Sequence, residues 1–276
     1  MRIAFVGCGA AGRPLGVAWR REGHAIGAVH ARTSAAEAVR VLGAGVPNGP
    51  LVDADVVVFA TPDDALAEVA RRHTLAPGQV ALHLSGAHPS TILAPTGART
   101  ASLHPLCAFA DLEPSLASLP DTYFFVEGAA AETAERLARD LGPHVARIGT
   151  KDKVLYHAGA AIASNYVVTL LAVARELLTQ AGVDEEHALG ALVRLARGAV
   201  DNVGHVGVAR GLTGPAARGD VELIARHVDA LSDPMRALYL KLLEATLPIA
   251  RAKGALSKEA EAALRSYCAG HDHSAG

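Results

Sequence analysis

The feature that most constrains the fold is a glycine pattern near the start of the chain. The apolar run from Ile3 to Val6 breaks into GCGAAG at residues 7–12. An apolar run followed by G-x-G-x-x-G predicts a strand, a tight turn and a helix start whose backbone N–H groups face a phosphate. Glycines here permit the turn, let a pyrophosphate approach the backbone and bring the helix close to the strand. The predicted phosphate-binding residues are Gly7, Gly9, Ala10, Ala11 and Gly12.

The segments that follow complete a βαβ unit. Residues 13–22 have a helical composition, with Pro14 in the first turn, where proline is tolerated, and Gly23 as a stop signal. A second apolar strand, residues 24–29, comes next. A complete unit that starts at residue 2 indicates a dinucleotide-binding domain. The alternative is a glycine-rich turn that holds no ligand.

The end of the second predicted strand indicates which dinucleotide binds. NAD sites usually place an acidic residue there for the ribose 2′-hydroxyl, whereas NADP sites need cations and hydroxyls for the 2′-phosphate. This chain has Arg32, Thr33 and Ser34 at that point, and no acid. Because Arg32 offers a planar fork of donors, we expect NADP. The alternative is that Arg32 is a solvated surface residue and that Ser34 only caps the next helix.

Charge and cysteine usage narrow the partners and the compartment. A formal net charge of −2 gives no field that attracts nucleic acid or anionic lipid, so we expect neither as a partner. The cysteines Cys8, Cys107 and Cys268 lie far apart and form no CxxC pair, which suits a reducing cytoplasm. The cluster His271-Asp272-His273 at the tail is interpreted as disordered rather than as a metal site.

Polar residues follow three further predicted strands. Residues 55–60 form an almost continuous apolar run, as expected for a central parallel strand covered on both faces, and further strands are predicted at 79–84 and 99–103. Since ligands in open α/β sheets lie beyond the carboxyl ends of the strands, the residues there are candidate site residues. They are Ala60, Thr61 and Pro62 after the first run, Ser85 and Gly86 after the second, and His104 after the third. Strands at 123–126 and 144–148 complete the predicted fold class, a doubly wound parallel sheet.

The pattern changes after residue 150. We expect a dinucleotide-binding domain at 1–150, an all-helical domain at 151–270 and a tail at 271–276. Alanine- and leucine-rich segments predict helices at 151–181, 184–203, 220–231, 233–253 and 257–268, with an irregular piece at 207–219. A junction between two such domains favours a ligand site, so we expect a small-molecule substrate there.

One helical segment is apolar enough to need an argument. Residues 154–174 contain no Asp, Glu, Lys or Arg, and the segment is long enough to cross a bilayer. It also contains several polar residues, so we interpret it as a buried helix of a soluble domain and expect no membrane. Its apolar surface exceeds what one subunit's helices can cover, which predicts a homodimer through the helical domain.

Lys153 and His157 are candidate proton donors at the junction. They lie four residues apart, on one face of a helix. Like charges resist double protonation, so a desolvated pair predicts a lowered pKa for at least one of them. Ser164 and Asn165 come two to three turns later, where they either bond neighbouring helices or line the cleft. The alternative is that Lys153 is solvated and His157 is a core histidine with a backbone partner.

Motifs along nearly the whole chain resemble those of a known group. The matching stretches are GCGAAG at 7–12, HLSG at 83–86, SLHP at 102–105, KVLYH at 153–157, SNY at 164–166, LTGP at 212–215 and RGD at 218–220. The chain resembles the 6-phosphogluconate dehydrogenase-like superfamily, and within it the Rossmann-like NADP oxidoreductases with a C-terminal helical domain of unknown function. Ketopantoate reductases and pyrroline-5-carboxylate reductases are related to this group.

The resemblance implies roles for particular residues. In β-hydroxyacid dehydrogenases and ketopantoate reductases a lysine that assists proton transfer is followed four residues later by asparagine. Lys153 matches that lysine, but His157 replaces the asparagine, so either residue could be the acid. Ser85, Asn165 and Arg218 are expected to contact the substrate oxygen and carboxylate, Ser164 to contact the substrate, and His104 to line the cleft. The alternative for Arg218 is a surface residue beside an N-cap, Asp220.

These observations predict an NADPH-dependent reductase of a small carbonyl compound, such as a 2-keto acid resembling ketopantoate. The Ser/Thr-Gly-Ser-Gly-Pro signature of pyrroline-5-carboxylate reductases is absent, which argues against an imine. Two alternatives stay open: a sensor that binds NADP(H) without turnover, and an oxidoreductase acting between NADP and a deazaflavin coenzyme.

Overall fold

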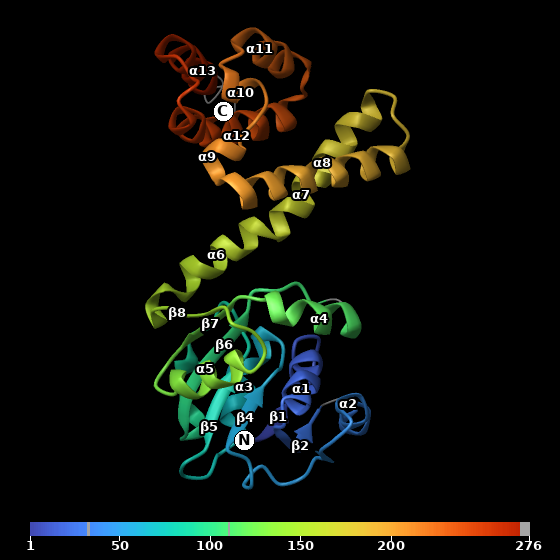
Figure 1. The fold of residues 1–276 in the computed structure, drawn as a ribbon, viewed down its shortest axis with the longest axis vertical. Coiled ribbons are helices and arrows are strands. Elements are labelled where there is room, and N and C mark those ends of the chain that lie inside the picture. The colour runs from blue at the N-terminus through green and yellow to red at the C-terminus, as the bar shows by residue number, and fades with distance from the viewer. Residues whose placement is uncertain (32–33, 110, 271–276) are drawn as a thin grey trace. The chain divides into compact units, whose positions relative to one another are not determined.

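Strand β1, the apolar run before the glycine turn, lies inside a mostly parallel sheet (Figure 1). The computed structural model describes residues 1–31, 34–109 and 111–270. Within these residues the sheet has eight strands in the order β3-β2-β1-β4-β5-β6-β7-β8. The strands are β1 (Arg2–Val6), β2 (Ala25–His30), β3 (Val46–Pro47), β4 (Val56–Phe59), β5 (Val80–His83), β6 (Arg99–Pro105), β7 (Phe124–Glu127) and β8 (Val145–Arg147).

Side chains alternate between two cores on opposite faces of the sheet. On β1, Ile3 and Phe5 pack into one core, whereas Ala4 and Val6 pack into the other. The first core is closed by α1 (Gly12–Arg21), α2 (Ala35–Leu42) and α5 (Ala131–Arg139), and by α4 (Leu112–Ser118) beside α1. The second is closed by α3 (Leu66–Arg71) and a short 3₁₀ segment, Ser90–Thr96. This three-layer arrangement explains the continuous apolar strands that the sequence shows.

The strand order reverses between β1 and β4. From β1 the chain proceeds outward through β2 and β3, then crosses to pair β4 with the other side of β1. In a sheet of this kind the loops at the carboxyl ends of the two central strands diverge and leave room for a ligand. The loops here are residues 7–11 and 60–62, which places the glycine turn at the switch point.

The last two strands add one antiparallel pairing to the predicted parallel sheet. Strand β7 runs antiparallel to β6, and β8 runs parallel to β7. The connection from β6 to β7 carries α4 along α1 and returns to the end of the sheet that it left, so Phe124 pairs with Pro105. The strand therefore enters from the carboxyl end of β6.

The rest of the chain is helical, as predicted. The helices are α6 (Lys153–Ala163), α7 (Asn165–Gln180), α8 (Glu185–Val206), α9 (Val208–Gly211), α10 (Pro215–Arg218), α11 (Val221–Ala230), α12 (Asp233–Lys253) and α13 (Lys258–Gly270). The helix predicted at 151–181 is interrupted at Ser164, whose ψ of −72° departs from helical values. Asp184 and Asp220 cap the helices that follow them, since each carboxylate accepts a backbone N–H three residues on.

The described chain divides into two compact units, Met1–Tyr166 and a second from Val167 onward. The first unit includes α6, which the sequence assigned to the helical domain beginning at residue 151. The reason is the anchoring of α6: the side chain of Lys153 is fully buried against β5 and β6.

The expectation that residues 154–174 form a buried helix is wrong for a single chain. Val154 and Leu155 are 74% and 78% exposed, and Ile162 and Val168 are also exposed. The run Thr150–Gln180 has the length and mean hydropathy to cross a membrane, but core helices of soluble proteins also pass this test.

Candidate active site

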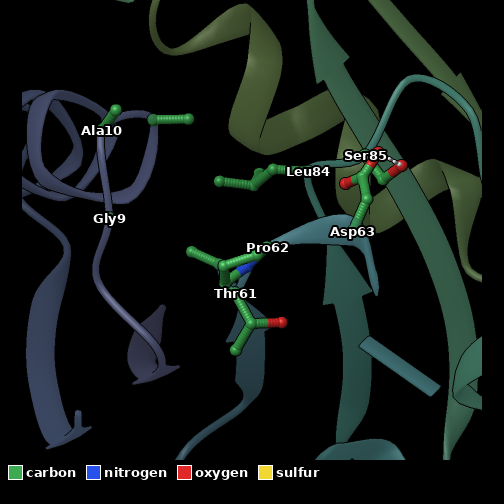
Figure 2. Close-up of a pocket in the computed structure, with 9 residues that line it drawn as sticks. Gly9, Ala10, Thr61, Pro62, Asp63, Leu84 and Ser85 are labelled. Atoms are coloured by element: carbon green, nitrogen blue, oxygen red, sulfur yellow. Dashed lines mark hydrogen bonds between the residues drawn. The ribbon is translucent and has the colours of Figure 1, made fainter. Parts of the chain in front are cut away.

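A groove lies at the switch point of the sheet, between the glycine turn and the ends of β4 and β5. It has a volume of about 260 Å³. Figure 2 shows Gly9 and Ala10 on one side, Thr61 and Pro62 below, and Asp63 with Ser85 at the far end. The lining residues are Gly9, Ala10, Ala11, Ala60, Thr61, Pro62, Asp63, Leu84 and Ser85. Most of these lining residues were predicted from the sequence to bind the cofactor, while Asp63 and Leu84 were not assigned to the site.

Two glycines determine the shape of the groove. Gly7 has a φ of +78°, and a Cβ there would lie 2.7 Å from the Thr61 side chain and 2.8 Å from the Ala60 carbonyl oxygen. A Cβ at Gly12 would lie 2.8 Å from the Ala60 Cβ. Helix α1 therefore approaches β4 closely only because both positions lack a side chain.

The hydroxyl of Ser85 is held by three hydrogen bonds at the end of the groove. Its hydroxyl donates to the Asp63 carboxylate at 2.8 Å and accepts the backbone N–H groups of Ala87 and His88, each at 3.2 Å. Its backbone N–H donates to Nδ1 of His83. Burial, with help from nearby Lys153, lowers the pKa of His83 to about 3, so that ring stays neutral and able to accept. The Ser85 hydroxyl is therefore committed to the protein.

Lys153 is buried beneath this loop. Its side chain is 1% exposed, and Nζ donates to the Ser85 carbonyl oxygen at 2.7 Å and to the Ser102 hydroxyl at 2.6 Å. Burial lowers the pKa of Lys153 to about 8, while the carboxylates of Glu127 and Asp63 act in the opposite direction. The predicted lowering is thus present, but its main cause is desolvation rather than repulsion from His157.

Two imidazoles converge on Gly86, the residue after Ser85. A Cβ at Gly86 would lie 2.8 Å from His104 Nε2 and 2.8 Å from His157 Nδ1. The two rings meet edge to face with centroids 6.2 Å apart. Burial, Lys153 and His157 together lower the pKa of His104 to about 4, so His104 is neutral at physiological pH. Nδ1 of His157 is buried and has no hydrogen-bond partner within the described residues.

Tyr156 completes the cluster. Its hydroxyl lies 2.6 Å from Nδ1 of His104, and its ring packs against Phe125 with centroids 4.8 Å apart. The sequence placed Tyr156 inside the KVLYH motif without giving it a role. Its spacing of three residues from Lys153 on the same helix is the signal that could have identified it.

Glu127 stabilises the segment that leads into α6, and the sequence did not identify it as a site residue. Its buried carboxylate accepts hydrogen bonds from the backbone and hydroxyl of Ser90 and from the hydroxyl of Thr150. Because Thr150 lies three residues before Lys153, this carboxylate helps to fix the start of α6.

The remaining predicted site residues belong to other parts of the chain. Ser164 and Asn165 are exposed at the junction of α6 and α7, and Arg218 is an exposed residue of the second unit. Ser34 caps α2, because its hydroxyl accepts the Glu37 N–H at 3.1 Å. Arg32 and Thr33 lie outside the described residues.

Family comparisons divide the chain into two parts. The family model described as a Rossmann-like domain matches residues 1–107, and a domain of unknown function, DUF2520, matches residues 122–246. These matches confirm the group that the motifs indicated. No functionally curated protein matches the chain.

Solved structures share the fold over most of the chain. Protein TM1727 from Thermotoga maritima has a TM-score of 0.77 and 28% identity, covering 91% of this chain and 99% of its own. A 1-pyrroline-5-carboxylate reductase from Streptococcus pyogenes has a TM-score of 0.63 and 13% identity, covering 90% and 98%. A pyrroline carboxylate reductase from Plasmodium falciparum, solved with NADP bound, has a TM-score of 0.57 and 13% identity, covering 92% and 98%.

Proposed function

Because this chain joins a Rossmann-like domain to a DUF2520 domain, we propose that it is an NADPH-dependent oxidoreductase that reduces a small carbonyl compound. One observation carries the proposal. The groove at the switch point ends at Ser85, and the next residue, Gly86, contacts two imidazoles. A dinucleotide groove thus leads directly to a cluster of proton-bearing side chains, as a reductase requires.

The groove suits a dinucleotide. Gly9, Ala10 and Ala11, just before the start of α1, line the groove, and such small residues let phosphates approach the backbone at the beginning of the helix. Thr61 Oγ1 is buried in the wall of the groove and has no partner within the described residues. Such an atom costs free energy unless a ligand bonds to it, which favours a polar ligand here. The solved relative with NADP bound supports NADP as that ligand.

The chain must supply a proton and orient the carbonyl. When bound, NADPH would supply the hydride that adds to the carbonyl carbon. The oxygen then needs a proton. His104 and His157 lie beside Gly86, and Tyr156 lies beside His104, so these three side chains are the candidate proton donors. Lys153 holds the Ser85 carbonyl from below and so keeps the loop beside the groove in place.

A 2-keto acid is the proposed substrate class. A cyclic imine is the second candidate, because two structures with this fold are pyrroline carboxylate reductases. Reduction of either substrate needs a hydride and a proton donor, so the site chemistry does not distinguish them. A screen of both compound classes does.

The test is NADPH oxidation with a panel of short 2-keto acids, aldehydes and cyclic imines, followed by absorbance. Reduction of a keto acid supports the proposal, and reduction of imines alone replaces it with the second candidate. Tight NADPH binding without turnover across the panel would overturn both and favour a sensor.

We further propose that two copies associate through the exposed apolar face of α6 and the helices after it. In this proposal the apolar face is covered by a second copy and does not enter a membrane. Light scattering should give a dimer at micromolar concentration. Leu155→Glu places a charge at a 78% exposed apolar position and should yield a monomer, whereas Val52→Glu, at another exposed apolar position, should not. A monomeric wild type would reject this proposal.

A further inference from the structure

We propose that Tyr156 protonates the substrate oxygen and that His104 positions its hydroxyl group. The sequence assigned the proton to Lys153 or His157, so this assignment changes the proposed catalytic residue. It rests on the proposed reductase function.

The phenol of Tyr156 is fixed from two sides. Its ring meets Phe125 at 4.8 Å and His104 edge to face at 5.6 Å, between ring centroids. These two residues are directly opposite each other on β6 and β7, so Tyr156 packs across one cross-strand pair. The 2.6 Å contact between its hydroxyl oxygen and His104 Nδ1 then fixes the position of that oxygen.

Protonation favours the phenol as a donor. Burial raises the pKa of Tyr156, so its hydroxyl keeps its proton at neutral pH. His104 is neutral, because burial and the charges of Lys153 and His157 lower its pKa. In the tautomer that carries hydrogen on Nδ1, His104 donates to the phenol oxygen and leaves the phenol proton free for the substrate.

The proton transfer balances without a further reactant. Hydride adds to the carbonyl carbon, and the carbonyl π pair moves to the oxygen. The O–H bond of Tyr156 breaks, its proton passes to that oxygen, and the electron pair stays on the phenol oxygen. The Nδ1–H of His104 stabilises the phenolate, and because Tyr156 is only partly buried, a solvent proton restores it.

The competing donors are less well placed. Lys153 is 1% exposed and has two of its three N–H bonds committed to Ser85 and Ser102. Nδ1 of His157 is buried against Gly86 rather than directed to solvent. Lys153 therefore acts as a positioning residue.

The test is Tyr156→Phe, which keeps the ring and removes the hydroxyl. With whichever panel compound the wild type reduces, kcat should fall by about 10² to 10⁴, the usual contribution of general acid catalysis, while NADPH affinity and melting temperature stay unchanged. Tyr123→Phe is the matched control, because Tyr123 also packs on a histidine, His144, but its hydroxyl has no described partner. It should retain wild-type kcat.

A double-mutant cycle tests His104. Removing the ring nitrogens in His104→Phe should lower kcat, but the double variant with Tyr156→Phe should be no slower than Tyr156→Phe alone, because His104 acts through the phenol. The assignment would be overturned if the two losses in kcat multiplied in the double variant, or if Tyr156→Phe kept full activity. Either result would leave the reductase function intact. A wild type that binds NADPH and reduces nothing on the panel would overturn both.

Discussion

The Nζ atom of Lys153 lies 2.7 Å from the carbonyl oxygen of Ser85, which ties the first turn of α6 to the end of β5. The same atom reaches the Ser102 hydroxyl on β6. A buried lysine thus joins β6 and the segment after β5 to the helix that carries Tyr156 and His157. This arrangement keeps the loop at the end of the groove next to the proton-bearing cluster.

Lys153→Met should change how stability depends on pH. The pKa of Lys153 is about 8 in the folded protein and about 10.4 in an unfolded chain, so between these values the unfolded state binds more protons. Stability of the wild type relative to Lys153→Met should therefore rise with pH from about 8 to 10.4, by at most about 1.4 kcal/mol per pH unit. Urea unfolding of both proteins across this range measures it.

Lys151→Met is the control for this comparison, because Lys151 is exposed and lies two residues earlier. Its stability difference from the wild type should not vary over the same pH range. A Lys153→Met difference that is flat with pH would show that the ammonium group is not desolvated.

The sequence predicted the groove well because backbone requirements determine it. Gly7 and Gly12 admit no side chain against Ala60 and Thr61, and such positions leave a motif in the sequence. The ends of parallel strands gather at one edge of a sheet, so Ser85 and His104 could be placed near the groove from the order of the elements alone.

The roles of Lys153 and Tyr156 could not be predicted in the same way. Both lie on one face of α6, and periodicity does not show which of them is buried. That depends on where α6 meets β5 and β6, a tertiary relationship fixed by Ser102 and by the Glu127–Thr150 hydrogen bond. The direction of β7 was missed for a similar reason, since the path of α4 along α1 leaves no local sequence signal.

Exposure of the apolar helices is a second limit. Hydrophobic residues such as Leu155 and Ile162 indicate burial, but a sequence does not say whether the same chain or another copy covers them. The prediction of a buried helix and the prediction of a dimer rested on the same residues, and one chain alone contradicts only the first.

Gly86→Ala should lower activity more than it lowers stability. A Cβ would lie 2.8 Å from both His104 and His157, so the two rings must move, and with them the hydrogen bond to Tyr156. We expect kcat to fall by roughly tenfold to a hundredfold, because small displacements in an active site are costly. Steady-state kinetics with NADPH and a reducible substrate measures the loss.

Gly27→Ala provides the matched control in the same unit. A Cβ at Gly27 would meet its nearest atoms at 3.6 Å, an ordinary van der Waals distance. Its kcat should match the wild type, and unchanged kinetics in Gly86→Ala as well would show that the two imidazoles do not need their present positions.

Arg32→Ala should weaken NADPH binding and leave NADH binding nearly unchanged. The reason is that Arg32, Thr33 and Ser34 stand where NAD sites usually have an acidic residue, and a cation with two hydroxyl groups favours the 2′-phosphate of NADPH. Fluorescence titration with both cofactors measures the change. Arg40→Ala, at an exposed arginine on α2, is the control and should bind both cofactors like the wild type. Equal wild-type affinity for NADPH and NADH contradicts the assignment of NADP.

His157→Asn separates the two proton-donor assignments most sharply. It restores the Lys-x-x-x-Asn pattern of the related dehydrogenases and keeps a polar side chain beside Gly86. If Tyr156 is the acid, kcat should stay within about tenfold of the wild type, since general acid catalysis contributes about 10² to 10⁴ and is retained. The dependence of kcat on pH near neutrality should also be unchanged.

If His157 is the acid, kcat should fall by the full factor, and the limb of the pH profile near neutrality should disappear, because an imidazole titrates there and a phenol does not. Measuring His157→Asn and Tyr156→Phe with the same substrate, over the same pH range, therefore assigns the proton to one of the two side chains.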